Sequence, residues 1–144
     1  MTRRARRDEA GQVTAFVVIF MVALIFVAGL VIDGGLTLAA KRRAINEAQA
    51  AARAGAQILD TDAYRAGRTS ALKTDGSAEQ AALAYLAKAH PGAVATAHAS
   101  ADTVTVDEHF DQALNILGVA GMGSVTVDGH GSARTAHGVT RENG

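Results

Sequence analysis

The sequence predicts an α+β protein. We expect an N-terminal transmembrane helix extended by an Ala-rich helix, then a small head with one or two short helices and about three antiparallel strands. Three observations predict this class. No charged side chain occurs from Ala10 to Ile32, residues 36–59 are dominated by alanine and lack proline, and the strand-like patterns all follow Pro91.

The apolar run at residues 13–32 is long enough to cross a bilayer. Fourteen of its twenty side chains are Val, Ile, Leu or Phe, and twenty helical residues span about 30 Å, the thickness of the hydrocarbon core. Those side chains favour insertion by about 4–8 kcal/mol. Four arginines precede the run and three basic residues follow it, so the positive-inside rule favours a cytoplasmic N-terminus.

These features predict a single-pass cell-membrane protein in four parts: a basic cytoplasmic leader (1–11), a transmembrane helix (12–33), an Ala-rich extension helix (34–60) and an extracytoplasmic α+β head (61–144). The alternative is a secreted envelope-binding or ligand-binding module, released when the basic N-terminus and apolar run are cleaved as a signal. The apolar run is longer than the usual core of a signal peptide, which favours the anchor.

A stripe of mostly small side chains follows the membrane segment and suits close helix packing. Its partner is either the chain's own head or another subunit. Before it, two adjacent glycines cost a helix about 2 kcal/mol relative to alanine. We therefore expect a helix break at Asp33, Gly34 and Gly35. The Asp33 carboxylate is expected to be solvated at the membrane boundary, and the alternative is a packing contact with a basic residue of a neighbouring subunit. The candidate packing residues are Leu38, Ile45, Ala48, Ala52, Gly55 and Leu59.

The head begins with a loop at residues 60–77. A capping box of Ser77 and Gln80 predicts a helix that ends before Pro91. Strands are expected at 93–99 and 103–110, joined by a turn at 100–102. A short helix at 111–117 and a Gly-rich turn then lead to a final strand from Ser124 as far as Val139, with small residues facing inward.

Composition and motifs disfavour catalysis. The chain has no cysteine, so disulfides and thiolate chemistry are excluded, and 14 basic residues balance 14 acidic ones, so no basic field points to nucleic acid. The best local ligand cluster is Asp107, Glu108, His109 and Asp111, but strand alternation puts Glu108 on the opposite face from Asp107 and His109. We expect no catalytic residue, cofactor, metal or small-molecule substrate.

Three segments resemble the TadE/TadG-like proteins of tight-adherence (Flp-type) pilus assembly: Gly-Leu-Val-Ile-Asp-Gly-Gly at 29–35, Lys-Arg-Arg at 41–43, and Asn-Glu-Ala-Gln-Ala-Ala-Ala-Arg-Ala-Gly-Ala at 46–56. With the upstream apolar helix, the resemblance covers roughly residues 9–56. It implies a bacterial, membrane-anchored pilin-like or pilus-assembly component that acts by helix packing, with the lipid bilayer and other pilus proteins as partners.

The resemblance also raises the question of leader cleavage. Gly11 stands where prepilin leaders are cut, but Phe16 occupies the position where processed relatives carry glutamate. This difference favours an uncleaved anchor.

Overall fold

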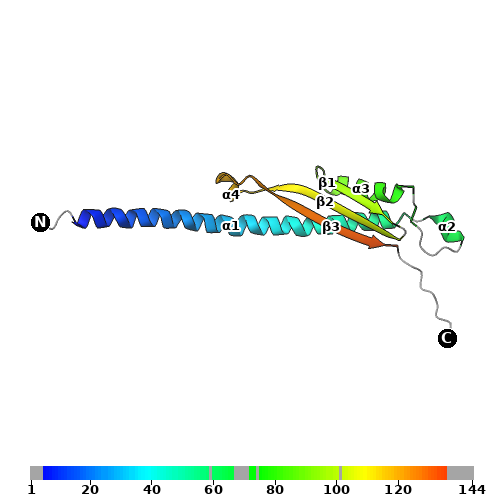
Figure 1. Ribbon diagram of the computed structural model, residues 1–144, viewed down its shortest axis with the longest axis horizontal. Coiled ribbons are helices and arrows are strands. Elements are labelled where there is room, and N and C mark those ends of the chain that lie inside the picture. The colour runs from blue at the N-terminus through cyan, green and yellow to red at the C-terminus, as the bar shows by residue number, and fades with distance from the viewer. Residues whose placement is uncertain (1–4, 59, 67–71, 74, 101, 136–144) are drawn as a thin grey trace, which may run out of the picture. The chain divides into compact units, whose positions relative to one another are not determined.

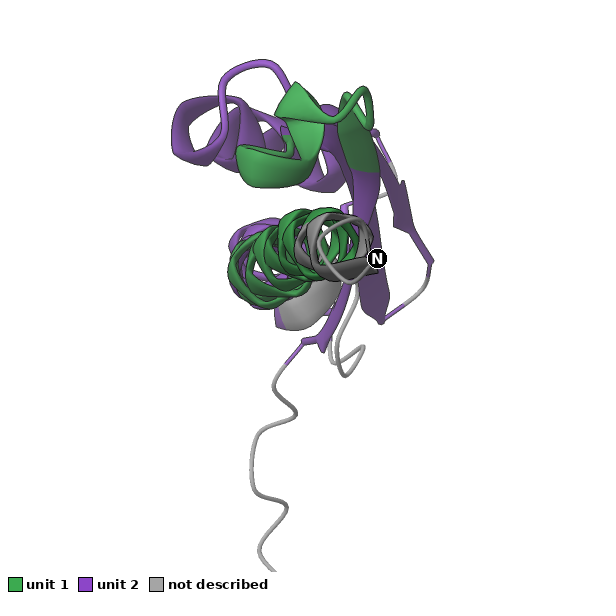
Figure 2. Cartoon of the chain, turned by 90° about the vertical axis from the view of Figure 1, so that its left-hand side faces the viewer, with its two compact units in different colours: residues 1–37, 113–125 green, residues 38–112, 126–144 purple. Residues whose placement is uncertain are grey.

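The computed structural model describes residues 5–58, 60–66, 72–73, 75–100 and 102–135. The expected α+β class is confirmed (Figure 1). The chain divides into two compact units: unit 1 comprises residues 1–37 and 113–125, and unit 2 comprises residues 38–112 and 126–144 (Figure 2). The elements, in chain order, are α1 (Ala5–Ala56), α2 (Thr61–Arg65), α3 (Ser77–Ala89), β1 (Val94–Ala99), β2 (Thr103–Ala113), α4 (Ile116–Val119) and β3 (Ser124–Arg134).

Helix α1 is continuous through Asp33, Gly34 and Gly35, so the predicted helix break is wrong. Helix formation is cooperative, and the long helical stretches on both sides, of which the following one is rich in alanine, offset the local cost of two glycines. The Asp33 side chain does not compete for the backbone of its own helix, because its carboxylate bonds to a distant segment. The Asp33 carbonyl accepts a further bond, 2.8 Å long, from the Thr37 hydroxyl.

Unit 2 is built from one sheet with helices on one of its faces. The strand order is β1-β2-β3, all antiparallel, and β1 pairs with β2 from Val94 opposite His109 to Ala99 opposite Val104. The inward face of the sheet packs on α3 and on the part of α1 that belongs to this unit. The core consists largely of small side chains: Ala48, Ala51, Ala52, Ala56, Leu72, Ala78, Ala82, Leu86, Val104 and Val106.

Strand β3 lies directly on the backbone of α1. A β-carbon at Gly129 would lie 2.6 Å from the carbonyl carbon of Ala44, and one at Gly131 would overlap the backbone of Ala48. Both glycines are buried, as is Val127 on the same face. The expectation that this strand turns small residues inward is therefore confirmed, and the reason is the close approach of two backbones.

This arrangement shows what covers the predicted packing stripe. Ala48, Ala52 and Gly55 are buried within unit 2, where Gly55 faces the carbonyl of Ala78. Ile45 is half-buried, and Leu38 is 54% exposed. Leu59 lies outside the described residues. Of the two partners left open by the sequence, the chain's own head thus covers the small-residue part of the stripe.

Some predicted boundaries of the head are wrong. Strand β2 continues to Ala113 where a helix was expected from Asp111, because the Asp111 carboxylate accepts a 2.8 Å bond from the Thr126 hydroxyl of β3. The short helix that was expected after this strand is reduced to α4. Strand β3 ends at Arg134, and the last expected residue, Val139, lies outside the described residues.

The predicted capping box is also absent. Helix α3 begins at Ser77, its N-cap is Gly76 with φ of 81°, and no side chain caps it. The Ser77 amide instead donates to the Asp75 carboxylate, over 3.0 Å. The loop before it contains the short helix α2.

We predict that Gly131→Ala destabilises the head by about 1–3 kcal/mol, because the added methyl group meets helix backbone that cannot rotate away. Thermal unfolding of the full chain in detergent, followed by circular dichroism, measures the effect. The control is Gly123→Ala, where a β-carbon meets nothing within 4 Å. Equal melting temperatures for both variants would contradict the close contact.

Candidate functional site

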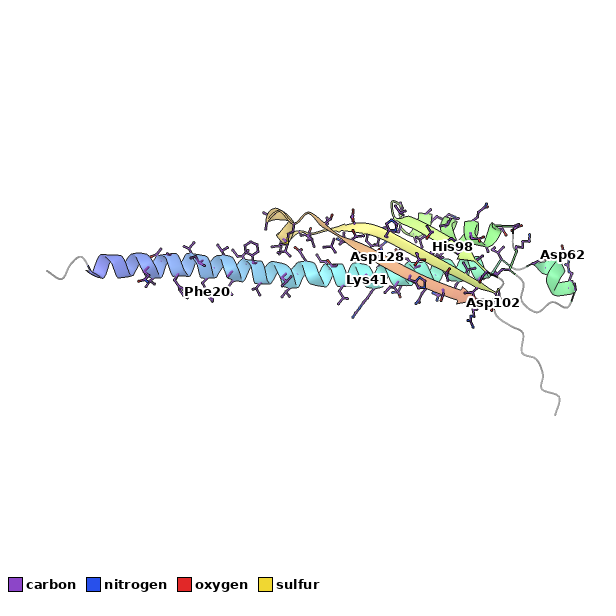
Figure 3. All side chains as sticks on the ribbon, viewed as in Figure 1. Phe20, Lys41, Asp62, His98, Asp102 and Asp128 are labelled. Carbon is purple, nitrogen blue, oxygen red and sulfur yellow. The ribbon has the colours of Figure 1, made fainter. Side chains whose placement is uncertain are left out.

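The N-terminal part of α1 presents an apolar surface. Its large side chains from Val13 to Ile32 are exposed, with Ile19 and Val31 each 70% exposed, and Phe20 projects from the helix (Figure 3). Exposed apolar surface of this extent is typical of a segment that contacts lipid or a partner. In the part of the chain that the structure describes, this is the one helix long and apolar enough to cross a membrane, which is compatible with a membrane anchor.

Asp33 occupies a buried position at the end of this apolar run. It is 1% exposed, so the expectation that water solvates it is wrong. Its Oδ1 accepts a bond from the backbone amide of Asn115 (3.0 Å), and its Oδ2 accepts bonds from the backbone amides of Ile116 (3.0 Å) and Leu117 (2.7 Å). These amides lie at the start of α4, where no intrahelical acceptor is available. The carboxylate therefore caps a segment more than eighty residues away.

The segment that Asp33 holds, residues 114–123, has no charged side chain. It contacts the apolar run itself, because a β-carbon at Gly29 would lie 2.7 Å from Cγ2 of Ile116. Val119 is 91% exposed and Met122 is also exposed. Unit 1 thus places a second apolar surface beside the C-terminal end of the apolar run.

Unit 2 contains a cluster of ionisable groups on its inward side. Glu108 of β2 is 2% exposed, and neither of its carboxylate oxygens has a hydrogen-bond partner among the described residues. Burial, and after it the nearby Glu47 carboxylate, raise the pKa of Glu108 to about 7 against the opposing effect of the Arg43 guanidinium. Arg43 Nε donates a 2.7 Å bond to Glu47 Oε1.

His90 completes this cluster at the C-terminal end of α3. Its Nδ1 lies 3.4 Å from Glu47 Oε2, without a hydrogen bond between them. Its ring packs edge-on against Phe110 with centroids 4.2 Å apart. One oxygen of each carboxylate and one imidazole nitrogen lie within 4.8 Å of one another. Two carboxylates and an imidazole are a ligand set that divalent transition metals accept.

The local cluster considered from the sequence is divided, as strand alternation predicted. Asp107 and His109 are exposed on the outward face of β2, whereas Glu108 points inward. Asp107 Oδ1 lies 2.7 Å from Nδ1 of His130 on β3. The Glu47, His90 and Glu108 cluster was missed because its members come from α1, the end of α3 and β2. Only the buried acid on an otherwise apolar strand face could have indicated it.

A long apolar helix and a small α+β head define the class of this protein: among the described residues, it has one helix long and apolar enough to serve as a membrane anchor. Residues 11–57 match the family model Tad, described as putative Flp pilus-assembly TadE/G-like. The resemblance noted in the sequence is thereby confirmed over about a third of the chain. This family is not known for enzymatic activity. The searches of curated proteins and of solved structures found no match.

We predict that Asp33→Asn loosens α4, because an uncharged amide replaces a carboxylate that accepts three backbone bonds. Hydrogen exchange of the full chain in detergent is the measurement. The amides of residues 115–117 should exchange about tenfold faster or more. The control is Asp111→Asn, which removes an exposed carboxylate bonded to one hydroxyl. Unchanged exchange in Asp33→Asn would show that the carboxylate does not support α4.

We predict that the stability of the Glu108→Gln variant relative to wild type increases as the pH rises. The raised pKa means that the folded chain holds a proton on Glu108 that the unfolded chain releases near pH 4.5. The stabilisation that protonated Glu108 contributes is therefore fully present below pH 4.5 and is lost as the pH rises to about 7. Denaturant unfolding in detergent with EDTA should show the variant equal to wild type at low pH. At pH 8 it should be more stable by about 3 kcal/mol.

The control for this prediction is Asp128→Asn, which removes an exposed carboxylate from the same sheet. An equal pH-dependent gain in Asp128→Asn would contradict the assignment of the effect to Glu108.

Proposed function

We propose that this chain is a membrane-anchored, non-catalytic component of a tight-adherence pilus assembly, with its N-terminus in the cytoplasm and its head outside. The observation that carries the proposal is the family match at residues 11–57, which spans the exposed apolar helix and the helical segment on which the head folds. The excess of arginines before the apolar run supports the orientation.

Different exposed surfaces of the chain suit different partners. The apolar side chains of residues 13–32 face lipid or the spans of partner subunits. Because the head already covers Ala48, Ala52 and Gly55, the extension helix offers partners its remaining surface, which is Leu38 followed by polar side chains such as Arg42, Gln49 and Arg53. Contacts with other pilus proteins on this helix are therefore largely polar and electrostatic.

The segment at residues 114–123 lies at the outer boundary of the bilayer in this arrangement. Its contact with Gly29 and its bonds to Asp33 hold it at the end of the apolar run, and its exposed Val119 and Met122 suit the boundary between headgroups and acyl chains. The Asp33 carboxylate avoids the cost of a charge in hydrocarbon because backbone amides solvate it.

The same contacts disfavour the secreted module. Cleavage near residue 35 would cut a continuous helix and separate Asp33 from the amides of residues 115–117. Removal of a leader after Gly11 would leave both the apolar run and Asp33 in place.

A deletion strain of the host bacterium, complemented from a plasmid, tests the proposal. Wild type should restore surface filaments. The double variant Val22→Arg and Ile25→Arg should not, because each arginine costs insertion about 2.5–3.5 kcal/mol. Val94→Arg, which introduces one arginine at an exposed position of β1, is the control and should restore them. Filaments that survive deletion would refute the pilus role.

Filaments restored by the double variant, together with a soluble species of lower intact mass in the medium, would instead favour the secreted module.

A further inference from the structure

Two carboxylates and an imidazole converge on one point inside unit 2, and the structure gives them too few partners. Glu47 Oε2, His90 Nδ1 and both oxygens of Glu108 form no hydrogen bond among the described residues. An unpartnered buried carboxylate is costly, because a charge removed from water needs a compensating partner. We propose that Glu47, His90 and Glu108 bind a divalent transition-metal ion such as Zn²⁺.

The ligand atoms are already close enough to share an ion. Those of the three residues lie within 4.8 Å of one another, and bonds of about 2.0–2.2 Å to zinc would draw them slightly closer together. Each ligand comes from a different element, since Glu47 lies on α1, His90 ends α3 and Glu108 lies on β2. Glu108 is 2% exposed and points into the cluster, so the most buried ligand is fixed by the sheet.

The charge and the surroundings also suit an ion. Two carboxylates balance a divalent cation, and the second oxygen of Glu47 remains bonded to Arg43, an outer contact of the kind that orients a ligating carboxylate. A cavity of about 260 Å³ adjoins the cluster and is lined by Arg43, His90 and Phe110. It offers an entry path and room for a water molecule in the fourth coordination position.

A bound ion would join the three elements of unit 2 that meet at this point. It would fix the C-terminal end of α3 and the middle of β2 against α1, so its role is to stabilise the head. A head with so few large apolar side chains gains much from such a link. This role does not depend on pilus assembly, and its test uses the purified chain alone.

Co²⁺ and Zn²⁺ titration of the full chain, in detergent, stripped with EDTA and freed of any affinity tag, tests the site. Co²⁺ should produce visible d–d absorption that saturates at one equivalent and is displaced by Zn²⁺. Zn²⁺ should raise the melting temperature by about 5 °C or more.

Glu108→Gln and His90→Gln should each weaken binding at least about tenfold and abolish the rise in melting temperature. The matched control is the double variant Asp107→Asn and His130→Gln, which removes a carboxylate and an imidazole from the outward face of the same sheet. It should bind as wild type does. Circular dichroism verifies that each variant is folded, and two ligand variants guard against failure of one to fold.

Absence of d–d absorption would overturn the proposal and would leave a shared proton as the occupant of the cluster. Binding that survives in both ligand variants, or that is lost in the outward control, would overturn it as well.

Discussion

The head depends on one close contact, in which β3 lies on the backbone of α1. Gly129 and Gly131 face Ala44 and Ala48, and neither glycine leaves space for a side chain. Because the backbones approach this closely, a core of alanines with two leucines and two valines is sufficient to exclude water. The same contact brings the inward face of β2 onto α1, so Glu108 is buried beside Glu47. The small residues therefore allow the sheet to pack directly on the helix.

Asp33 makes the corresponding contact in unit 1. An acid next to a membrane-length apolar run normally reaches water, but here three backbone amides replace the water. The bonds satisfy both the carboxylate and the first amides of α4, so neither group is left unpaired.

The two buried acids, Asp33 and Glu108, differ in their hydrogen-bond partners, and this difference indicates which of them is a candidate ligand. Both carboxylate oxygens of Asp33 accept bonds from backbone amides, whereas neither carboxylate oxygen of Glu108 has a hydrogen-bond partner among the described residues. The Asp33 carboxylate, with both oxygens hydrogen-bonded, has a structural role. An unsatisfied carboxylate beside an acid and an imidazole is a candidate ligand, which is why the proposed metal site lies at Glu108.

The sequence by itself determined the α+β class, the apolar helix, the Ala-rich extension and the resemblance to pilus-assembly proteins over roughly residues 9–56, which the family match at residues 11–57 confirms. Periodicity and residue type are local properties, so a single segment is enough to display them. Only the tertiary structure decided that Asp33 and the two glycines lie in an unbroken helix, that the head covers Ala48 and Ala52, and that Glu47, His90 and Glu108 meet. These outcomes depend on contacts between residues far apart in the chain, and no local pattern encodes which distant group will supply a hydrogen bond or fill a surface.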